Sequence, residues 1–222
     1  MDMLKLLVFD WDDVIILGSK EGYYKCYKET LKELGIVLSD DEFHGRIQKR
    51  WGQPFKEELR ELLLEHPAFL EQAVGIYTRK KFVENTFLDC LYEVSGANEI
   101  LMNLSKKYTL AVATANHRQM LEEKIIPKFH IPPVFKRILT AYEVPNGKSK
   151  PDRYMLELIM HEQKVKPEEC VYIGDAENDV GMARNASVEP IVVLTGHLTR
   201  AKAEELGVSK IIPDITHLEE VI

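Results

Sequence analysis

Short apolar stretches recur along the chain, and most of them end in polar residues or glycine. They cover residues 4–9, 109–113, 137–140, 171–173 and 190–194. Runs of this length, rich in β-branched residues, indicate strands buried on both faces of a parallel sheet. Segments with helical spacing of apolar residues lie between them, for example residues 151–161 and 178–185. This alternation predicts an α/β core built on a parallel sheet.

The connection after the first strand does not follow this alternation of strands and helices. From about residue 20 to about residue 88, the chain has helical periodicity and no convincing strand. Ser39 and Glu42 have the spacing of a capping box, which predicts the start of a helix. We therefore expect residues 18–88 to form an all-helical insertion, and residues 1–17 with 89–222 to form the core.

Composition narrows the class of protein. The 222 residues are 45% hydrophobic and carry a formal net charge of −7, which argues against a nucleic-acid partner. The sequence contains no apolar stretch of transmembrane length, and acidic residues interrupt the first apolar run as no signal peptide would. Three widely spaced cysteines suit a reducing compartment. We predict a cytoplasmic protein with no membrane partner.

Polar side chains of complementary kinds follow the predicted strands or the loops between them: Asp10, Asp12, Thr114, Lys148, Asp175 and Asp179. Because the carboxyl ends of parallel strands meet at one edge of a sheet, these groups can converge on one pocket. Crowded carboxylates repel one another unless a cation lies among them, and a divalent metal is the economical candidate. A hydroxyl, an ammonium and carboxylates around such a cation form an inventory for phosphoryl transfer.

In their order and spacing these residues resemble the four motifs of the haloacid dehalogenase-like hydrolases: Asp10-x-Asp12-x-Val14, Thr114, Lys148 before Pro151-Asp152, and Gly174-Asp175-x-x-x-Asp179. The insertion resembles the helical cap of the phosphoglycolate phosphatase and β-phosphoglucomutase branch. The resemblance implies a Rossmann-like parallel-sheet core with an inserted all-helical cap, and Mg²⁺ as the cofactor.

The resemblance also implies a role for each matching residue. Asp10 would form a phosphoaspartyl intermediate, and Asp12 would act as general acid and then as general base. The phosphoryl group would be held by residues of the second and third motifs: Thr114, Ala115, Asn116 and Lys148. The implied metal site is acidic: Asp10, Asp12 through its main-chain carbonyl, Asp175, and Asp179 in or next to the metal shell.

The carboxylate at position 12 favours phosphate-ester hydrolysis over dehalogenation, because an alkoxide leaving group needs a proton and a halide does not. We predict an Mg²⁺-dependent phosphatase for a small phosphorylated metabolite. A phosphomutase is one alternative, although Phe55 stands about where the sugar-phosphate mutases place a phosphate-binding arginine. A catalytically silent binding protein is another, with Asp13 in the usual place of glycine as the lesion. A receiver domain is disfavoured, because it would be about half this length.

The sequence leaves the roles of several residues undecided. Lys150 competes with Lys148 for the role of phosphate-binding lysine. Asn116 and Asp179 could serve as helix-start residues instead of site residues. Residues 50–56 resemble the specificity loop of the branch, but they could equally be a packed connector between two helices. The sequence identifies neither the metabolite nor the oligomeric state.

Overall fold

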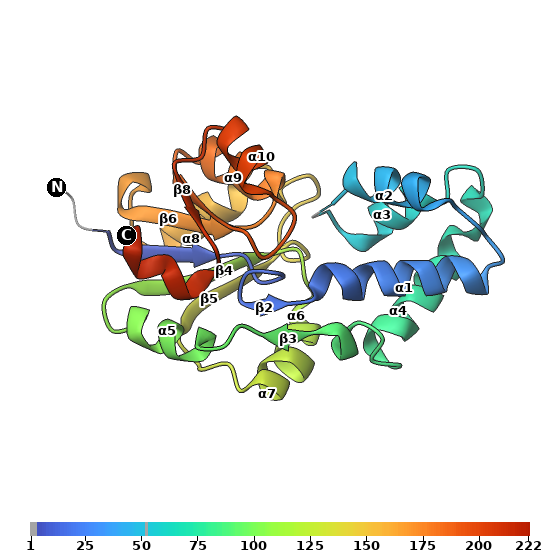
Figure 1. Ribbon diagram of the computed structural model, residues 1–222, viewed down its shortest axis with the longest axis horizontal. Helices are drawn as coiled ribbons and strands as arrows, with labels where there is room; N and C mark the ends of the chain where they lie inside the picture. Colours follow the sequence, from blue (N-terminus) through green and yellow to red (C-terminus); the bar gives the residue numbers. More distant parts are fainter. Residues whose placement is uncertain (1–3, 52) are drawn as a thin grey trace. The chain divides into compact units, whose positions relative to one another are not determined.

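The structure, a computed structural model, describes residues 4–51 and 53–222 (Figure 1). The chain divides into two compact units. We call the first, which runs up to Leu17 and resumes over Tyr92–Ile222, the sheet unit, and the second, Gly18–Leu91, the helical unit. The helical unit extends slightly beyond the predicted end of the insertion at residue 88.

Within the described residues, the sheet unit contains a six-stranded parallel sheet in the order β5-β4-β1-β6-β7-β8. The strands are β1 (Leu6–Phe9), β4 (Thr109–Thr114), β5 (Phe135–Thr140), β6 (Cys170–Gly174), β7 (Glu189–Val193) and β8 (Lys210–Ile212). The chain builds one half of the sheet outward from β1 through β4 and β5, and then the other half through β6 to β8. The carboxyl end of β1 therefore lies where the two halves meet, which is where open α/β sheets bind ligands.

Helices cover both faces of this sheet. They are α5 (Ala97–Leu104), α6 (Arg118–Met120), the π-helical turn η3 (Leu121–Ile125), α7 (Ile126–Phe129), α8 (Tyr154–Gln163), α9 (Glu177–Asn185) and α10 (Arg200–Glu205), with 3₁₀ turns η4 (Pro167–Glu169) and η5 (Ile215–Glu220). Figure 1 shows α8 and α9 on one side of the sheet and α5 and α7 on the other. All residues of β1 and β6 are buried. The predicted α/β fold with a parallel sheet is confirmed.

Two features of the sheet unit were not predicted. Strand β8 has only three residues, which is too short for its apolar pattern to stand out. Strands β2 (Ile16–Leu17) and β3 (Tyr92–Glu93) form a two-residue antiparallel ladder. These two strands are far apart in sequence, so their pairing leaves no local signal.

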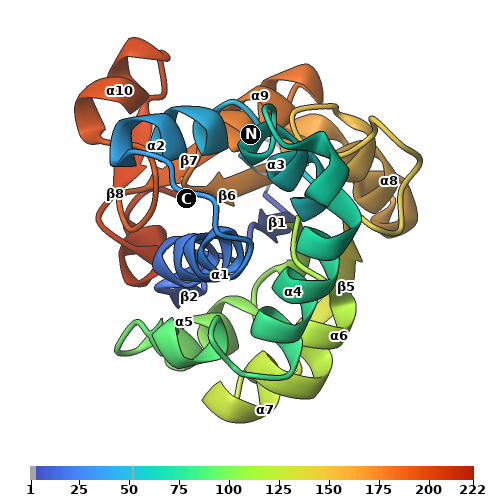
Figure 2. The same cartoon turned by 90° about the vertical axis from the view of Figure 1, so that its right-hand side faces the viewer.

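Within its described residues, the helical unit contains helices and turns but no strand: α1 (Ser19–Glu33), α2 (Asp40–Gln48), α3 (Phe55–Leu62), η1 (Pro67–Phe69), α4 (Leu70–Phe82) and η2 (Leu88–Cys90). Helices α1 and α4 contact each other, and Figure 2 shows α1 nearly end-on beside α4. The predicted capping box is present, since the Ser39 main-chain N–H donates to Glu42 Oε2 at 3.0 Å and the Glu42 main-chain N–H donates to Ser39 Oγ. None of the helices in the described parts of the chain is long and apolar enough to cross a membrane.

Candidate active site

Three adjacent strands deliver polar residues to one edge of the sheet. Asp10 follows β1, Thr114 ends β4, and Asp175 follows β6. The main-chain N–H of Asp10 donates to the carbonyl of Ile173 at 2.8 Å, which extends the β1–β6 ladder to the start of the site. The sheet itself therefore fixes where the Asp10 side chain begins.

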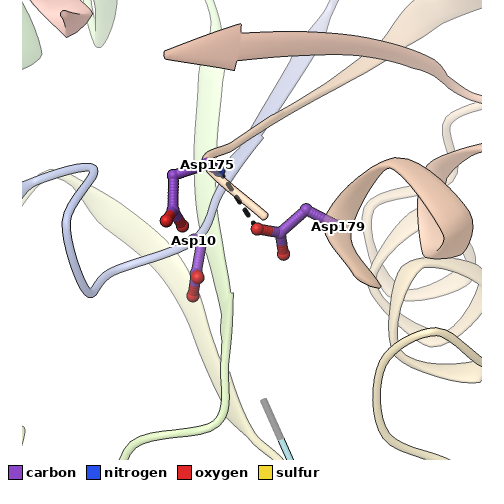
Figure 3. A group of neighbouring side chains, drawn as sticks. All are labelled: Asp10, Asp175 and Asp179. Atoms are coloured by element: carbon purple, nitrogen blue, oxygen red, sulfur yellow. Dashed lines mark hydrogen bonds between the residues drawn. The ribbon is translucent and has the colours of Figure 1, made fainter. Parts of the chain in front are cut away.

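Three buried carboxylates meet at this edge. Asp10, Asp175 and Asp179 come from the ends of β1 and β6 and from the first turn of α9, and all are buried. One carboxylate oxygen of each lies within 4.8 Å of the others. Figure 3 shows the three side chains turned toward a common space. The structure thus brings together three of the predicted metal-site residues.

A buried lysine lies among these carboxylates, and it is Lys150. Its Nζ is 2.8 Å from Asp10 Oδ1 and 2.8 Å from Asp179 Oδ1, and the side chain is 4% exposed. Burial alone would lower the pKa of Lys150, but the two carboxylates raise it above its ordinary value, so the ammonium stays charged. Three carboxylates and one ammonium leave a formal local charge of −2.

The structure places Lys148, the preferred candidate for the phosphate-binding lysine, outside this cluster and its competitor Lys150 inside it. Lys148 is exposed, and its Nζ lies 3.1 Å from Asp152 Oδ2 in a surface ion pair. Lys148 and Asp152 are four residues apart in the sequence, and their ion pair is local to this loop. The preference for Lys148 came from its distance to Pro151-Asp152. The useful signal was that Lys150 directly precedes the proline.

The second motif surrounds Asp12. Asn116 Nδ2 donates to Asp12 Oδ1 at 3.1 Å, and the main-chain N–H of Asn116 donates to Thr114 Oγ1 at 3.1 Å. Thr114 and Asn116 are buried, and Ala115 is half-buried. The Asn116 side chain also accepts a hydrogen bond from the main chain of His117. Asn116 therefore contacts a site carboxylate, in addition to lying just before α6.

Burial favours the neutral form of two of these carboxyl groups, Asp10 and Asp175, when no cation is bound. Burial raises the pKa of Asp10 from 3.8 to about 7, although Lys150 acts in the opposite direction. Burial, followed by the charges of Asp179 and Asp10, raises the pKa of Asp175 well above its usual range. A divalent cation would reverse both effects, because it supplies the missing positive charge. Several carboxylate oxygens with a local charge of −2 form a donor set that fits a hard divalent cation.

Two glycines allow the carboxylates to approach the main chain this closely. A Cβ atom on Gly174 would lie 2.5 Å from Asp179 Cβ, and one on Gly196 would lie 1.8 Å from Asp175 Oδ2. Only glycine fits at either position without a shift of the site. The main-chain N–H of His197, next to Gly196, donates to Asp175 Oδ2 at 2.9 Å. The loop after β7 is therefore part of the site.

Asp13 occupies the position where the family motif usually has glycine. Its backbone is left-handed, with a φ of 56°, and its side chain is buried. Aspartate is one of the few non-glycine residues that adopts this conformation at modest cost.

Trp11, just before Asp12, is also buried, and its ring lies against the ring of Phe135. Its main-chain N–H donates to Asp10 Oδ1 at 2.7 Å.

The predicted specificity loop, residues 50–56, packs on its own unit. Gly52 lies outside the described residues. The ring of Trp51 meets Tyr24 edge-on at 5.7 Å, and the ring of Phe55 stacks on Tyr77 at 4.7 Å. These contacts match the alternative interpretation of this loop as a packed connector.

One residue of the site was not among the candidates. Tyr172 lies on β6, fully buried, and its hydroxyl is 3.0 Å from Asp179 Oδ1. A tyrosine inside an apolar strand is an ordinary core residue, so its type alone gave no reason to single it out. Its position two residues before Gly174, on the same side of β6, was the available signal.

Comparison with known proteins settles the family. The family model for haloacid dehalogenase-like hydrolases matches residues 4–187. The chain belongs to the haloacid dehalogenase-like hydrolases. This confirms the resemblance seen in the four motifs, and with it the class of enzyme.

Individual members of the family resemble the chain over nearly its whole length. A glyceraldehyde 3-phosphate phosphatase of Pyrococcus furiosus is 26% identical over 204 residues, which cover 86% of this chain and 81% of the relative. A haloacid dehalogenase-like hydrolase from Bacteroides fragilis superposes with a TM-score of 0.82 at 22% identity, covering 97% and 99% of the two chains. A predicted phosphoglycolate phosphatase from Haemophilus somnus 129PT gives a TM-score of 0.80 at 16% identity, covering 100% and 99%. The last two likenesses show the shared fold.

Proposed function

We propose that this protein is an Mg²⁺-dependent phosphatase that hydrolyses a small phosphorylated metabolite through a phosphoaspartyl intermediate on Asp10. The observation that carries the proposal is the contact of Lys150 with both Asp10 and Asp179, beside Asp175, at the switch point of the sheet. A buried ammonium among carboxylates suits a phosphoryl group bound together with a cation. The relationship to a glyceraldehyde 3-phosphate phosphatase supports the same reaction class.

The donor set supports a cation held by the carboxylates of Asp10 and Asp175, with the main-chain carbonyl of Asp12 as a further ligand. When bound, the metal would act as a Lewis acid that neutralises charge on the phosphoryl oxygens. Lys150 would add a second positive group, fixed by its two ion pairs. Thr114 accepts a hydrogen bond from Asn116, so its hydroxyl proton stays available for a phosphoryl oxygen.

The reaction would proceed in two transfers. In the first, an Asp10 carboxylate oxygen attacks phosphorus, the bond to the leaving oxygen breaks, and Asp12 gives that oxygen a proton. In the second, the ionised Asp12 takes a proton from water, the water oxygen attacks phosphorus, and the bond to Asp10 breaks. The Trp11 N–H and Lys150 both hold Asp10 at Oδ1, which orients the carboxylate for attack. Asn116 orients Asp12 in the same way.

A metabolite panel tests this proposal. Phosphate release would be measured with Mg²⁺ and with a chelator, on glyceraldehyde 3-phosphate and on glycolate, sugar, nucleotide and amino-acid phosphates. We expect release from at least one compound, abolished by the chelator and by Asp10→Asn. Asp152→Asn, an equivalent change in the surface pair with Lys148, should retain activity. Asp10→Asn activity close to that of the unchanged protein would refute the nucleophile.

Product analysis separates hydrolysis from phosphoryl transfer to a sugar. The Phe55 ring is stacked on Tyr77 within the helical unit, and it offers no charge to a second phosphate. We therefore expect free phosphate from a sugar monophosphate and no isomeric sugar phosphate. Accumulation of the isomer would identify a mutase, and silence of the whole panel with Mg²⁺ would favour a binding protein.

A further inference from the structure

Two loops leave the carboxyl edge of the sheet side by side, one after β4 and one after β5. The last residues of these strands, Thr114 and Thr140, are paired in register. The main-chain N–H of Ala141 donates to the carbonyl of Thr114 at 2.8 Å, so the pairing continues one residue beyond β5. We call residues 115–117 the β4 loop and residues 141–143 the β5 loop. A contact that fixes one loop can therefore act on the other.

An ion pair joins the two loops. Arg118, the first residue of α6, follows the β4 loop directly, and Glu143 is the last residue of the β5 loop. Arg118 Nε and Nη2 lie 3.1 Å and 2.8 Å from Glu143 Oε1, and Nη2 is also 2.8 Å from Oε2. A guanidinium that binds a carboxylate through several atoms is fixed in direction as well as in distance. Both side chains are largely buried, with exposed fractions of 35% and 31%, so the pair is screened less than one in open solvent.

Both members of this pair are anchored to β5. Arg118 Nη2 also donates to the carbonyl of Ile138. Glu143 Oε2 accepts a hydrogen bond of 2.8 Å from the main-chain N–H of Thr140, and the Glu143 main-chain N–H donates to the Thr140 carbonyl at 3.0 Å. The ion pair therefore ties the start of α6 to the end of a strand whose main chain is held by the sheet.

The β4 loop is thus held at both ends, and Asn116 lies in its middle. The loop follows Thr114, whose Oγ1 accepts the Asn116 main-chain N–H at 3.1 Å, and it leads into Arg118. A second contact joins the two loops, since the ring of His117 stacks on that of Tyr142 with centroids 3.7 Å apart and planes at 21°. Because the loop is so short, a shift of Arg118 would move Asn116 with it.

Asn116 in turn holds the proton donor of the proposed reaction. Its Nδ2 donates to Asp12 Oδ1 at 3.1 Å, and its own Oδ1 accepts from the main-chain N–H of His117 at 2.8 Å. The amide is therefore oriented by the β4 loop, and it orients Asp12. Proton transfer requires hydrogen-bond reach to the leaving oxygen, and a misplacement of about 1 Å can slow a reaction about 10²-fold.

We propose that Arg118 and Glu143 are positioning residues for proton transfer. Their ion pair fixes the β4 loop, and through Asn116 it fixes the carboxyl group of Asp12. The inference rests on the proposed function, because it concerns the proton that Asp12 gives to the leaving oxygen. Loss of the pair should therefore slow only those reactions whose leaving group needs that proton.

The choice of leaving group tests this consequence. The best alkyl phosphate of the metabolite panel requires a proton on its leaving oxygen, whereas p-nitrophenyl phosphate does not. Values of kcat/KM would be compared, because they report the first transfer and exclude the later attack of water. For Glu143→Gln and for Arg118→Met, we expect kcat/KM on the alkyl phosphate to fall about tenfold. On p-nitrophenyl phosphate it should stay within about twofold.

Glu162→Gln is the matched control. Glu162 lies in α8, and its Oε2 is 3.2 Å from Nε of Arg137 on β5. With a side chain that is 36% exposed, Glu162 resembles Glu143 in burial. This change removes an ion pair from the same strand but none from the β4 loop, so both kcat/KM values should stay within about twofold.

A double variant tests the route through Asn116. Asn116→Ala alone should show the same selectivity as Glu143→Gln, with a larger loss on the alkyl phosphate. If Glu143 acts through Asn116, the addition of Glu143→Gln to Asn116→Ala should lower kcat/KM by less than about twofold more. A further tenfold loss in the double variant would mean that Glu143 acts by another route, and it would overturn the inference.

Equal losses on the two substrates, or no loss on the alkyl phosphate, would refute the positioning role and leave the phosphatase proposal intact. If Arg118→Met does not fold, Glu143→Gln carries the test, because glutamine keeps the size of the side chain. Failure of the unchanged protein to release phosphate from any alkyl phosphate of the panel would instead overturn the proposed function, and the inference with it.

Discussion

Each of the two units buries a lysine, and the two ammonium groups lie in different surroundings. In the sheet unit, Lys150 Nζ is 2.8 Å from two carboxylates. In the helical unit, Lys81 Nζ is 4.4 Å and 4.8 Å from the ring centroids of Tyr23 and Phe87, and it hydrogen-bonds to the Tyr23 hydroxyl. Aromatic faces hold a cation through their quadrupole and through packing. Carboxylates hold it by charge.

The different surroundings of the two lysines distinguish a candidate functional site in the sheet unit from a structural core in the helical unit. Around Lys150, the acidic groups outnumber the lysine and leave a negative charge that a doubly charged ion would balance. Burial of unbalanced charge destabilises a fold, so its presence at a strand end indicates function. Around Lys81, the buried ammonium makes cation–π contacts with aromatic rings of the helical unit. The same residue type is therefore expected to serve catalysis in one unit and stability in the other.

The largest expected effect comes from Lys150→Met compared with Lys148→Met. Loss of Lys150 removes a positive group from the phosphoryl site, and we expect kcat/KM to fall about 10²- to 10³-fold. Lys148→Met removes a surface ion pair, and activity should stay within about threefold of the unchanged protein. Steady-state kinetics on the best substrate of the panel measures both. A larger loss for Lys148→Met would restore the assignment made from sequence.

The next effect concerns stability in the metal-free protein. Because the pKa of Asp10 is raised to about 7, the folded state holds a proton that the unfolded state releases near pH 4. The stability from this group is complete at lower pH and is lost as pH rises to 7. Asp10→Asn, which stays neutral, should therefore stabilise the metal-free protein at pH 8 by up to about 4 kcal/mol and change little near pH 4.

Thermal unfolding at the two pH values measures this, with Glu65→Gln in the helical unit as the control. Arg46 lowers the pKa of Glu65 through a side-chain hydrogen bond, so ionisation of that carboxyl supports the fold. The control change should lower the unfolding temperature at pH 8. If Asp10→Asn also lowered the unfolding temperature in the absence of metal, ionisation of the buried Asp10 carboxyl group would not be destabilising the fold at this pH.

A smaller effect is expected from Lys81→Met. Methionine fills similar space among the rings, so the variant should lose the cation–π contacts and the hydrogen bond to the Tyr23 hydroxyl, together at least about 1 kcal/mol in the free energy of unfolding. Urea denaturation measures this loss, and kcat/KM should remain within about threefold. A hundredfold loss of activity with unchanged stability would place Lys81 in the catalytic machinery and remove the contrast between the two lysines.

The smallest effect compares Asp13 with Gly35, which have a similar left-handed backbone in the two units, with φ of 56° and 71°. Asp13→Gly should stabilise the protein by up to about 1 kcal/mol, and Gly35→Ala should destabilise it by about 1 kcal/mol. Denaturation curves give both values. If Asp13 were the lesion of a silent enzyme, Asp13→Gly would also raise activity more than tenfold, whereas we expect little change.

Much of the sheet unit could be predicted because two central strands, β1 and β6, are buried throughout and are followed directly by aspartates. The run from Leu6 to Asp10 shows both features in five residues. The three-residue β8 and the β2–β3 ladder could not be predicted, because their pairing depends on segments distant in sequence. The same applies to the loop with Gly196, which reaches Asp175 only through the folded sheet.

The residue types of the site could be predicted better than the contacts that each side chain makes. The acidic residues at the ends of β1 and β6 follow from sheet geometry alone. The choice between Lys148 and Lys150 depends on how one loop turns before α8, and the sequence offers one local hint to it, that Lys150 directly precedes Pro151. The contacts of Asp179 with Tyr172 and with two main-chain N–H groups depend on the folded turn after β6, which no spacing rule reveals.

The central claim is that Asp10 carries the phosphoryl group, and trapping of the intermediate tests it most directly. In Asp12→Asn, p-nitrophenyl phosphate can still react, because its leaving group departs without a proton, while the attack of water is slowed. Acid quenching and peptide mass spectrometry would then locate the phosphoryl group. We predict close to one group per protein, on the peptide that contains Asp10, and none in the Asp10→Asn, Asp12→Asn double variant. A phosphoryl group on any other residue, or product formation with Asp10 unmodified throughout, would contradict the account.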